Sequence, residues 1–169
     1  MVEVDKIYES KVKFTGVFDF KVVYGFVYHW LMDNRYFLTQ EKNYTEKIKP
    51  EGKEIEVDWD SKKKISDYFR FYLKIHWFVP FLNAVEVERE GVKVKMNKGQ
   101  VEVKITAYLE KDYEHRWETT SISKFLRGLY DRYIIRNRIE SYEEKIIEEV
   151  DELVAQIKAF LELEGKKSR

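Results

Sequence analysis

Residue types that most often carry chemistry are few in this chain and lie far apart. His29, His76 and His115 fall in separate segments, and none has the HExxH spacing of a zinc-binding helix. The chain contains no cysteine, which excludes a thiol nucleophile and a cysteine-ligated metal. It also lacks the glycine-rich phosphate loops and the GxSxG turn of hydrolases. We therefore expect a non-enzymatic protein without a metal or cofactor.

Carboxylates alternate with apolar residues between Glu54 and Asp60. In a strand, alternate side chains share one face, so these carboxylates would lie in a row. Such a row could bind a cation. A short loop after Asp60 would instead set it opposite Arg70 and Lys74, and we favour this salt-bridged, solvated sheet face.

Two basic clusters could bind anions. The first interleaves aromatic and basic residues at alternate positions from Tyr68 to His76, a pattern that single-stranded nucleic-acid readers use. The second consists of Arg127, Arg132, Arg136 and Arg138. A solvated helix face is the favoured interpretation of this cluster, and a site for a phosphate or an acidic partner is the alternative. Acidic neighbours flank the first cluster, and the chain has 31 basic and 31 acidic residues. Nucleic-acid binding is therefore the less favoured interpretation.

The segments that must position these residues follow from hydrophobic periodicity. Alternation predicts strands, and apolar residues three or four apart predict helices. Strands are expected over 10–18, 41–49, 54–60, 65–79, 84–89, 92–97 and 100–110, and helices over 19–34 and 121–163. The result is one α+β domain with about seven antiparallel strands, a helix after the first strand and a long C-terminal helix packed on the sheet.

The register of the predicted strands follows from the requirement that the apolar residues of neighbouring strands face the same side of the sheet. A turn at Glu90-Gly91 pairs Val87 with Val94 and also sets acidic residues opposite lysines. A second turn at Lys98-Gly99 would pair Met96 with Val101.

In the order and length of these segments, the chain resembles the START-like helix-grip superfamily, which includes polyketide-cyclase-type and plant-allergen-type proteins. The resemblance implies a curved antiparallel sheet around the C-terminal helix, with an apolar ligand held between them. The final helix is longer than the family pattern. A triphosphate-tunnel fold is a less favoured alternative, because cross-strand pairing already explains the alternating Glu and Lys residues.

Aromatic residues make up 16% of the chain, and the large rings could fill the core or line a cavity. The candidates for a ligand pocket are Trp30, Trp59, Phe69, Phe71, Trp77, Phe125 and Tyr133. We expect a binding module that holds an apolar or aromatic small molecule between the sheet and the final helix.

A continuous helix over 121–163 would be ~65 Å long, longer than a compact domain of this size is wide. A shift in the apolar phase predicts a break near 137–141, so 138–164 would project or fold back. Its apolar stripe comprises Ile146, Val150, Leu153, Ile157 and Phe160. This stripe could cover the chain's own core or pair with a second copy, and a homodimer is our structural alternative.

The longest apolar run, 22–32, is too short to span a bilayer. The N-terminal residues are acidic and lack the basic start of a signal peptide. Together with the absence of cysteine, these features indicate a cytoplasmic protein.

Overall fold

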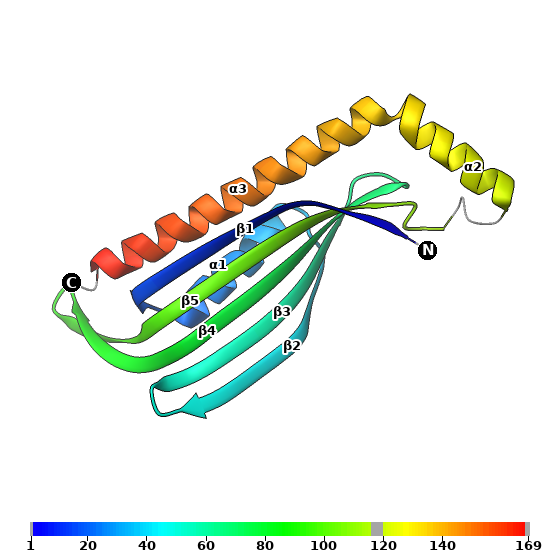
Figure 1. Ribbon diagram of the computed structural model, residues 1–169. Helices are drawn as coiled ribbons and strands as arrows, with labels where there is room; N and C mark the ends of the chain where they lie inside the picture. Colours follow the sequence, from blue (N-terminus) through cyan, green and yellow to red (C-terminus); the bar gives the residue numbers. More distant parts are fainter. Residues whose placement is uncertain (1, 116–119, 168–169) are drawn as a thin grey trace.

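The computed structural model describes residues 2–115 and 120–167, apart from the side chains of residues 131 and 134. Its strands are β1 (Glu3–Phe18), β2 (Leu38–Lys49), β3 (Gly52–Lys64), β4 (Phe69–Arg89) and β5 (Val92–Lys111). Its helices are α1 (Phe20–Asp33), α2 (Ser121–Leu129), the π-helix η1 (Tyr130–Ile134) and α3 (Arg136–Lys167). The class is α+β, as the sequence predicts (Figure 1).

The strands form one antiparallel sheet in the order β1-β5-β4-β3-β2. The prediction of seven strands is wrong, because two pairs of expected strands are each continuous. Pro80 does not end β4, which passes it with a register shift between Phe78 and Phe81. The two strands expected over 92–97 and 100–110 form the single strand β5. It pairs along its length with β4 on one side and β1 on the other.

Gly99 explains why β5 does not turn at Lys98-Gly99, where the alternation of apolar side chains would have allowed a hairpin. A Cβ at this position would lie 2.1 Å from the Phe81 carbonyl oxygen. The glycine therefore admits the backbone of the irregular β4 segment at close range, a recognised role of glycine within strands. The predicted pairing of Met96 with Val101 is wrong, since both residues lie on β5 and Val101 pairs with Phe14 of β1. The predicted β4–β5 turn is confirmed, with Val87 opposite Val94.

Helix α1 begins and ends as its sequence predicts. The Asp19 side chain caps it by accepting a hydrogen bond from the Val22 N–H, and Asn34 is the C-cap. Its apolar face, which includes Val23, Val27 and Leu31, is fully buried. Helix α1 thereby covers one face of the sheet.

Helix α3 lies on the same face of the sheet, beside α1. Phe26 of α1 stacks on Phe160 of α3 with ring centroids 5.0 Å apart. Alternate residues of β3, β4 and β5 are buried beneath the helices, as the strand periodicity predicts. The other face of these strands carries polar and charged side chains, so the domain has one helical layer and one open sheet face.

Polar contacts also tie α3 to the strands. Tyr36 donates a hydrogen bond to one carboxylate oxygen of Glu149, and Lys63 lies 2.6 Å from the other. Tyr8 of β1 donates to Asp151 over 2.6 Å. Burial, followed by the charge of Glu149, raises the pKa of the Tyr36 phenol. These contacts fix α3 along the domain.

The helical segment breaks earlier than the sequence analysis predicts. It widens into η1 and ends at Ile135, which is buried and whose N–H donates to the Tyr130 carbonyl. Helix α3 then starts at Arg136 and runs back along the domain. The segment 138–164 therefore packs beside β1 and α1, whereas α2 extends past the end of the sheet (Figure 1).

Candidate functional site

An unusual amount of apolar surface is exposed on α2 and η1. Five side chains spaced three or four residues apart share one helix face. They are Ile122 (71% exposed), Phe125 (66%), Leu126 (49%), Leu129 (39%) and Tyr133 (70%). We call this set the α2 apolar face. Single exposed apolar residues are ordinary, but a contiguous patch on one element is typical of a binding surface.

The opposite side of α2 contacts the domain, and it does so with polar groups. Arg127 is buried, and its guanidinium lies 3.1 Å from a carboxylate oxygen of Glu3 and 3.6 Å from one of Asp112. It also donates a hydrogen bond to the Tyr68 hydroxyl over 3.1 Å. Tyr130 packs edge-on against the Tyr68 ring. Helix α2 thus turns its charged side inward and its apolar side outward.

The electrostatics of Arg127 support its role as an anchor. Burial disfavours its charge, but the hydrogen bond to Tyr68 and the charges of Glu3 and Asp112 outweigh that cost and raise the pKa of the guanidinium. Asp112 has only 2% of its side chain exposed. The arginine therefore stays charged and neutralises a buried carboxylate at the point where α2 meets the sheet.

Helix α2 depends on such contacts because it is short. Isolated helices of fewer than ~12–15 residues are marginal in water, and α2 spans Ser121–Leu129. Thr120 caps its start by accepting a hydrogen bond from the Ser123 N–H over 3.1 Å. The cap, the Arg127 anchor and the continuation into η1 hold the helix in place.

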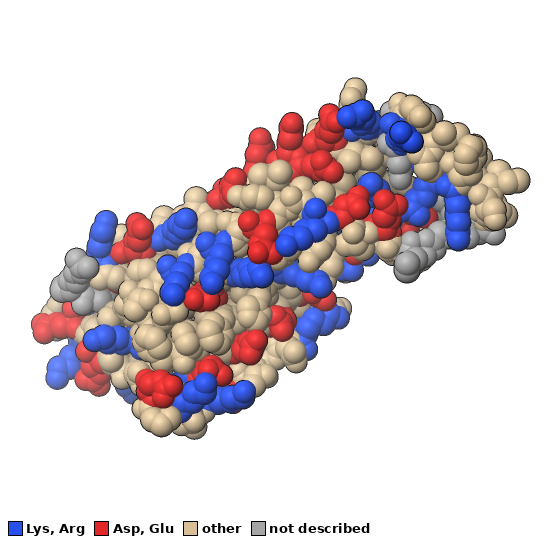
Figure 2. All heavy atoms as spheres, in the orientation of Figure 1, with Lys and Arg blue, Asp and Glu red and all other residues tan. Residues whose placement is uncertain are grey.

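Basic residues are concentrated on α2 and at the start of α3. From Ser121 to Arg138 the sequence contains five basic residues and one acidic residue. Lys124, Arg132 and Arg138 are exposed, and within the described parts of the chain they have no ion-pair partner. The acidic residues of α3 begin directly beside this cluster. Arg136 lies 3.3 Å from Glu140, and red atoms adjoin the blue atoms at the start of α3 in Figure 2.

A second candidate is a groove of about 590 Å³ on the open face of the sheet. Its wall includes Asp58, Asp60, Tyr72, Lys74 and His76. The polar groups are already matched with one another: His76 lies 2.6 Å from Asp58, and Tyr72 donates to Asp60 over 2.8 Å. Lys74 lies opposite Asp60 as predicted, but Arg70 lies opposite Lys64 and not opposite a carboxylate. The wall also includes Lys42 and Lys104, and Lys104 lies 3.6 Å from Glu9. These contacts favour the salt-bridged interpretation of this face.

The predicted basic-aromatic strip on β4 is divided between these two regions. Arg70 forms an ion pair with the buried Glu110, and Lys74 lies above the rings of Tyr72 and Tyr108. Tyr68, in contrast, belongs to the anchor of α2. The strip is thus not a continuous basic platform.

Five of the seven ligand-pocket candidates lie in the core, where they contact other rings. They are Trp30, Trp59, Phe69, Phe71 and Trp77. Tyr24 of α1 lies over Trp59 and Trp77 with centroid distances of 4.5 and 5.2 Å. Phe125 and Tyr133 lie outside this cluster, on the α2 apolar face. The predicted ligand between sheet and helix gains no support from this packing.

The residues proposed to bind a second copy also face inward. Ile146, Val150, Leu153 and Ile157 are fully buried in the chain's own core, and Phe160 packs against it. A dimer through this stripe remains a prediction, and it would require these side chains to leave the core. Among the described helical residues, the contiguous exposed apolar side chains lie instead on α2 and η1.

Sequence reasoning did not identify the α2 apolar face, although the signal was present. The spacing of Ile122 to Tyr133 is amphipathic, but periodicity alone cannot tell whether the chain covers the apolar side. Arg127 carried the missing information, because it lies opposite the apolar face and has partners more than fifty residues away in sequence.

In the part of the chain that the structure describes, no group of three or more His, Asp or Glu residues is arranged to hold a metal ion. Among the described helices, none combines the length and apolarity needed to cross a bilayer. Comparison with protein-family models, curated proteins and solved structures gave no match to this chain.

Proposed function

We propose that this protein is a non-enzymatic docking module. Its domain acts as a rigid scaffold, and the α2 apolar face is the surface that binds a partner. The observation that carries the proposal is the orientation of α2: the buried Arg127 faces the domain, while Phe125 and Tyr133 are more than half exposed. A helix that served only to complete the core would have the reverse orientation.

The energetics support the same proposal. Burying an apolar side chain contributes ~1.5–3 kcal/mol relative to leaving it in water. Five partly exposed side chains on α2 therefore forgo several kcal/mol in the free protein. A partner that covers them recovers this free energy, and the helix is already ordered for the contact by Arg127, which lowers the entropic cost of binding.

Photo-cross-linking tests the proposal. Benzoylphenylalanine replaces Phe125 in the full chain, and adducts formed in a lysate of the source cell are identified by mass spectrometry. We expect a discrete protein or lipid adduct that disappears when Leu129→Glu is added. The matched control carries the probe at Ile48, an apolar residue that is 91% exposed and lies on β2, an edge strand of the sheet.

Adducts at position 125 that match those at position 48, or that persist with Leu129→Glu, would show that exposure alone explains the labelling. Circular dichroism and thermal unfolding of each variant confirm that the domain is intact. Because the altered residues lie outside the buried core, a change in adducts reports on the surface and not on folding.

A further inference from the structure

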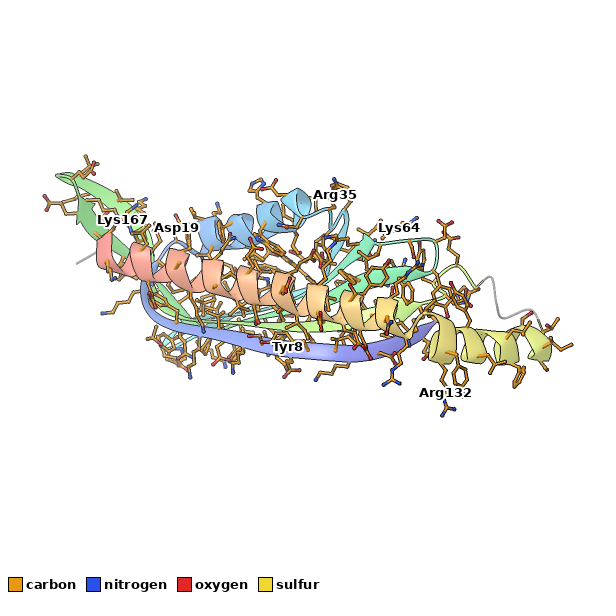
Figure 3. All side chains as sticks on the ribbon, turned by 90° about the horizontal axis from the view of Figure 1, so that it is seen from above. Tyr8, Asp19, Arg35, Lys64, Arg132 and Lys167 are labelled. Atoms are coloured by element: carbon orange, nitrogen blue, oxygen red, sulfur yellow. The ribbon has the colours of Figure 1, made fainter. Side chains whose placement is uncertain are left out.

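We infer that the partner of the α2 apolar face is an anionic membrane surface, on which the protein docks peripherally. This inference rests on the proposed docking function and names its partner. The relevant features are the apolar face, the basic residues around it and the position of α2 at one end of the molecule (Figures 1 and 3).

The composition of the helix matches a helix that lies in the plane of a bilayer interface. Such helices carry Phe and Leu on one side and Lys or Arg on the other. Here Phe125, Leu126 and Leu129 form the apolar side, and the exposed Lys124 lies on the other side, next to the buried anchor Arg127. Tyr133 adds an aromatic ring at the end of the face, and tyrosines are enriched at membrane–water interfaces.

Charge complementarity selects an anionic surface. Arg132 lies at the joint between α2 and α3 and extends away from the strands (Figure 3). Its guanidinium carbon is 5.6 Å from the Tyr133 ring centre, so cation and aromatic ring occupy the same edge of the apolar face. Arg138 follows within the first turn of α3, where it is exposed, whereas Arg136 is paired with Glu140 at 3.3 Å. Lipid phosphates at the rim of the inserted face would meet these cations.

The size of the face argues against a second copy as the partner. Five side chains at these exposures present on the order of 500 Å². Two copies that buried this surface completely would cover ~1,000 Å² in total, below the ~1,200–2,000 Å² of specific stable interfaces. The face is also convex and one helix wide. A fluid bilayer accommodates such a shape without a preformed groove.

The test is co-sedimentation of the full chain with vesicles. One preparation contains equimolar phosphatidylcholine and phosphatidylglycerol, and the other contains phosphatidylcholine alone. We expect binding to the anionic vesicles that weakens in neutral vesicles and at high salt, because salt screens exposed charges. Arg132→Gln should weaken binding about fivefold, the typical effect of one basic residue near an anionic surface. Phe125→Ser combined with Leu129→Ser should abolish it.

Ile48→Ser is the matched control and should bind as the unmodified chain does. Unchanged circular dichroism of the Phe125→Ser, Leu129→Ser protein shows that lost binding is not lost folding, because α2 lies outside the core cluster. Equal sedimentation with and without anionic vesicles would overturn the membrane inference. If the position-125 cross-link then identified a protein, the docking proposal would stand; if neither experiment gave an α2-dependent contact, both would fail.

Discussion

Replacing Arg127 with methionine should release α2 from the domain while leaving the core folded. Methionine keeps a long unbranched side chain but removes the charge and every hydrogen-bond donor. The substitution removes the contacts to Glu3, Asp112 and Tyr68, all of which lie at the base of α2. Since the five side chains of the α2 apolar face are 39–71% exposed, their packing opposes the opening only weakly, and Arg127 supplies the main polar contacts.

The magnitude follows from these contacts. Hydrogen bonds to charged groups contribute ~1.5–3 kcal/mol when buried, and the pair with the half-exposed Glu3 contributes less. A net loss of about 2 kcal/mol corresponds to a roughly 30-fold larger opening constant for the helix. The same value is an upper limit on the change in global stability, because the core cluster does not include α2.

Hydrogen–deuterium exchange measures this opening directly. In Arg127→Met, the amide protection factors of peptides that cover 124–133 should fall about 30-fold relative to the unmodified protein. Peptides from β4 and β5 should exchange at unchanged rates. Arg138→Met is the matched control, because Arg138 is exposed and has no ion-pair partner among the described residues. Unchanged protection over 124–133, or an equal loss in the control, would refute the role of Arg127 as the anchor.

Three further predictions concern the domain itself. Gly99→Ala should lower the free energy of unfolding in urea by ~1–3 kcal/mol or more, because the alanine Cβ would meet the Phe81 carbonyl. An unchanged urea midpoint of unfolding would mean that β4 does not approach β5 this closely. The Tyr36 phenol has a raised pKa in the folded state, whereas in the unfolded chain it loses its proton near the usual pKa of about 10. The free energy of unfolding should therefore fall as pH rises from about 10. Tyr36→Phe should remove this part of the loss in alkaline melting curves, and parallel curves for the two proteins would contradict the assignment. Trp59→Phe should lower the free energy of unfolding by about 1 kcal/mol more than Trp77→Phe does. The reason is that the Trp59 indole N–H donates to a tyrosine of α1 over 2.8 Å, whereas the Trp77 indole N–H has no partner in the described structure. Equal losses in chemical denaturation would show that the hydrogen bond contributes nothing.

Much of the sheet could be predicted from the sequence because its information is local. Strand alternation identified the buried faces of β3 and β4, and the Glu90-Gly91 turn fixed the register that pairs Val87 with Val94. At Lys98-Gly99 the same reasoning failed. The dipeptide fits a hairpin, but Gly99 is required for a contact with Phe81 on another strand. The alternation of side chains within one segment gives no information about a contact with another strand.

The long helical segment shows the same limit. Its phase shift predicted a break, yet the break occurs over η1, before the predicted position. From the sequence, Phe125 and Tyr133 are grouped with the buried rings because both are large and lie on the apolar stripe of the predicted final helix. Their exposure depends on Arg127 reaching Glu3 and Tyr68. Such contacts, distant in sequence, decide which side of an amphipathic helix the domain covers.

The most direct test of the docking surface is a nitroxide scan over 121–133 in the presence of the anionic vesicles. Because the chain has no cysteine, each introduced cysteine carries the only label. We expect oxygen collision rates to peak with helical period at Ile122, Phe125, Leu126 and Leu129, with a minimum at Lys124. Peaks at Lys124, or rates that do not change when vesicles are added, would contradict membrane docking through the α2 apolar face.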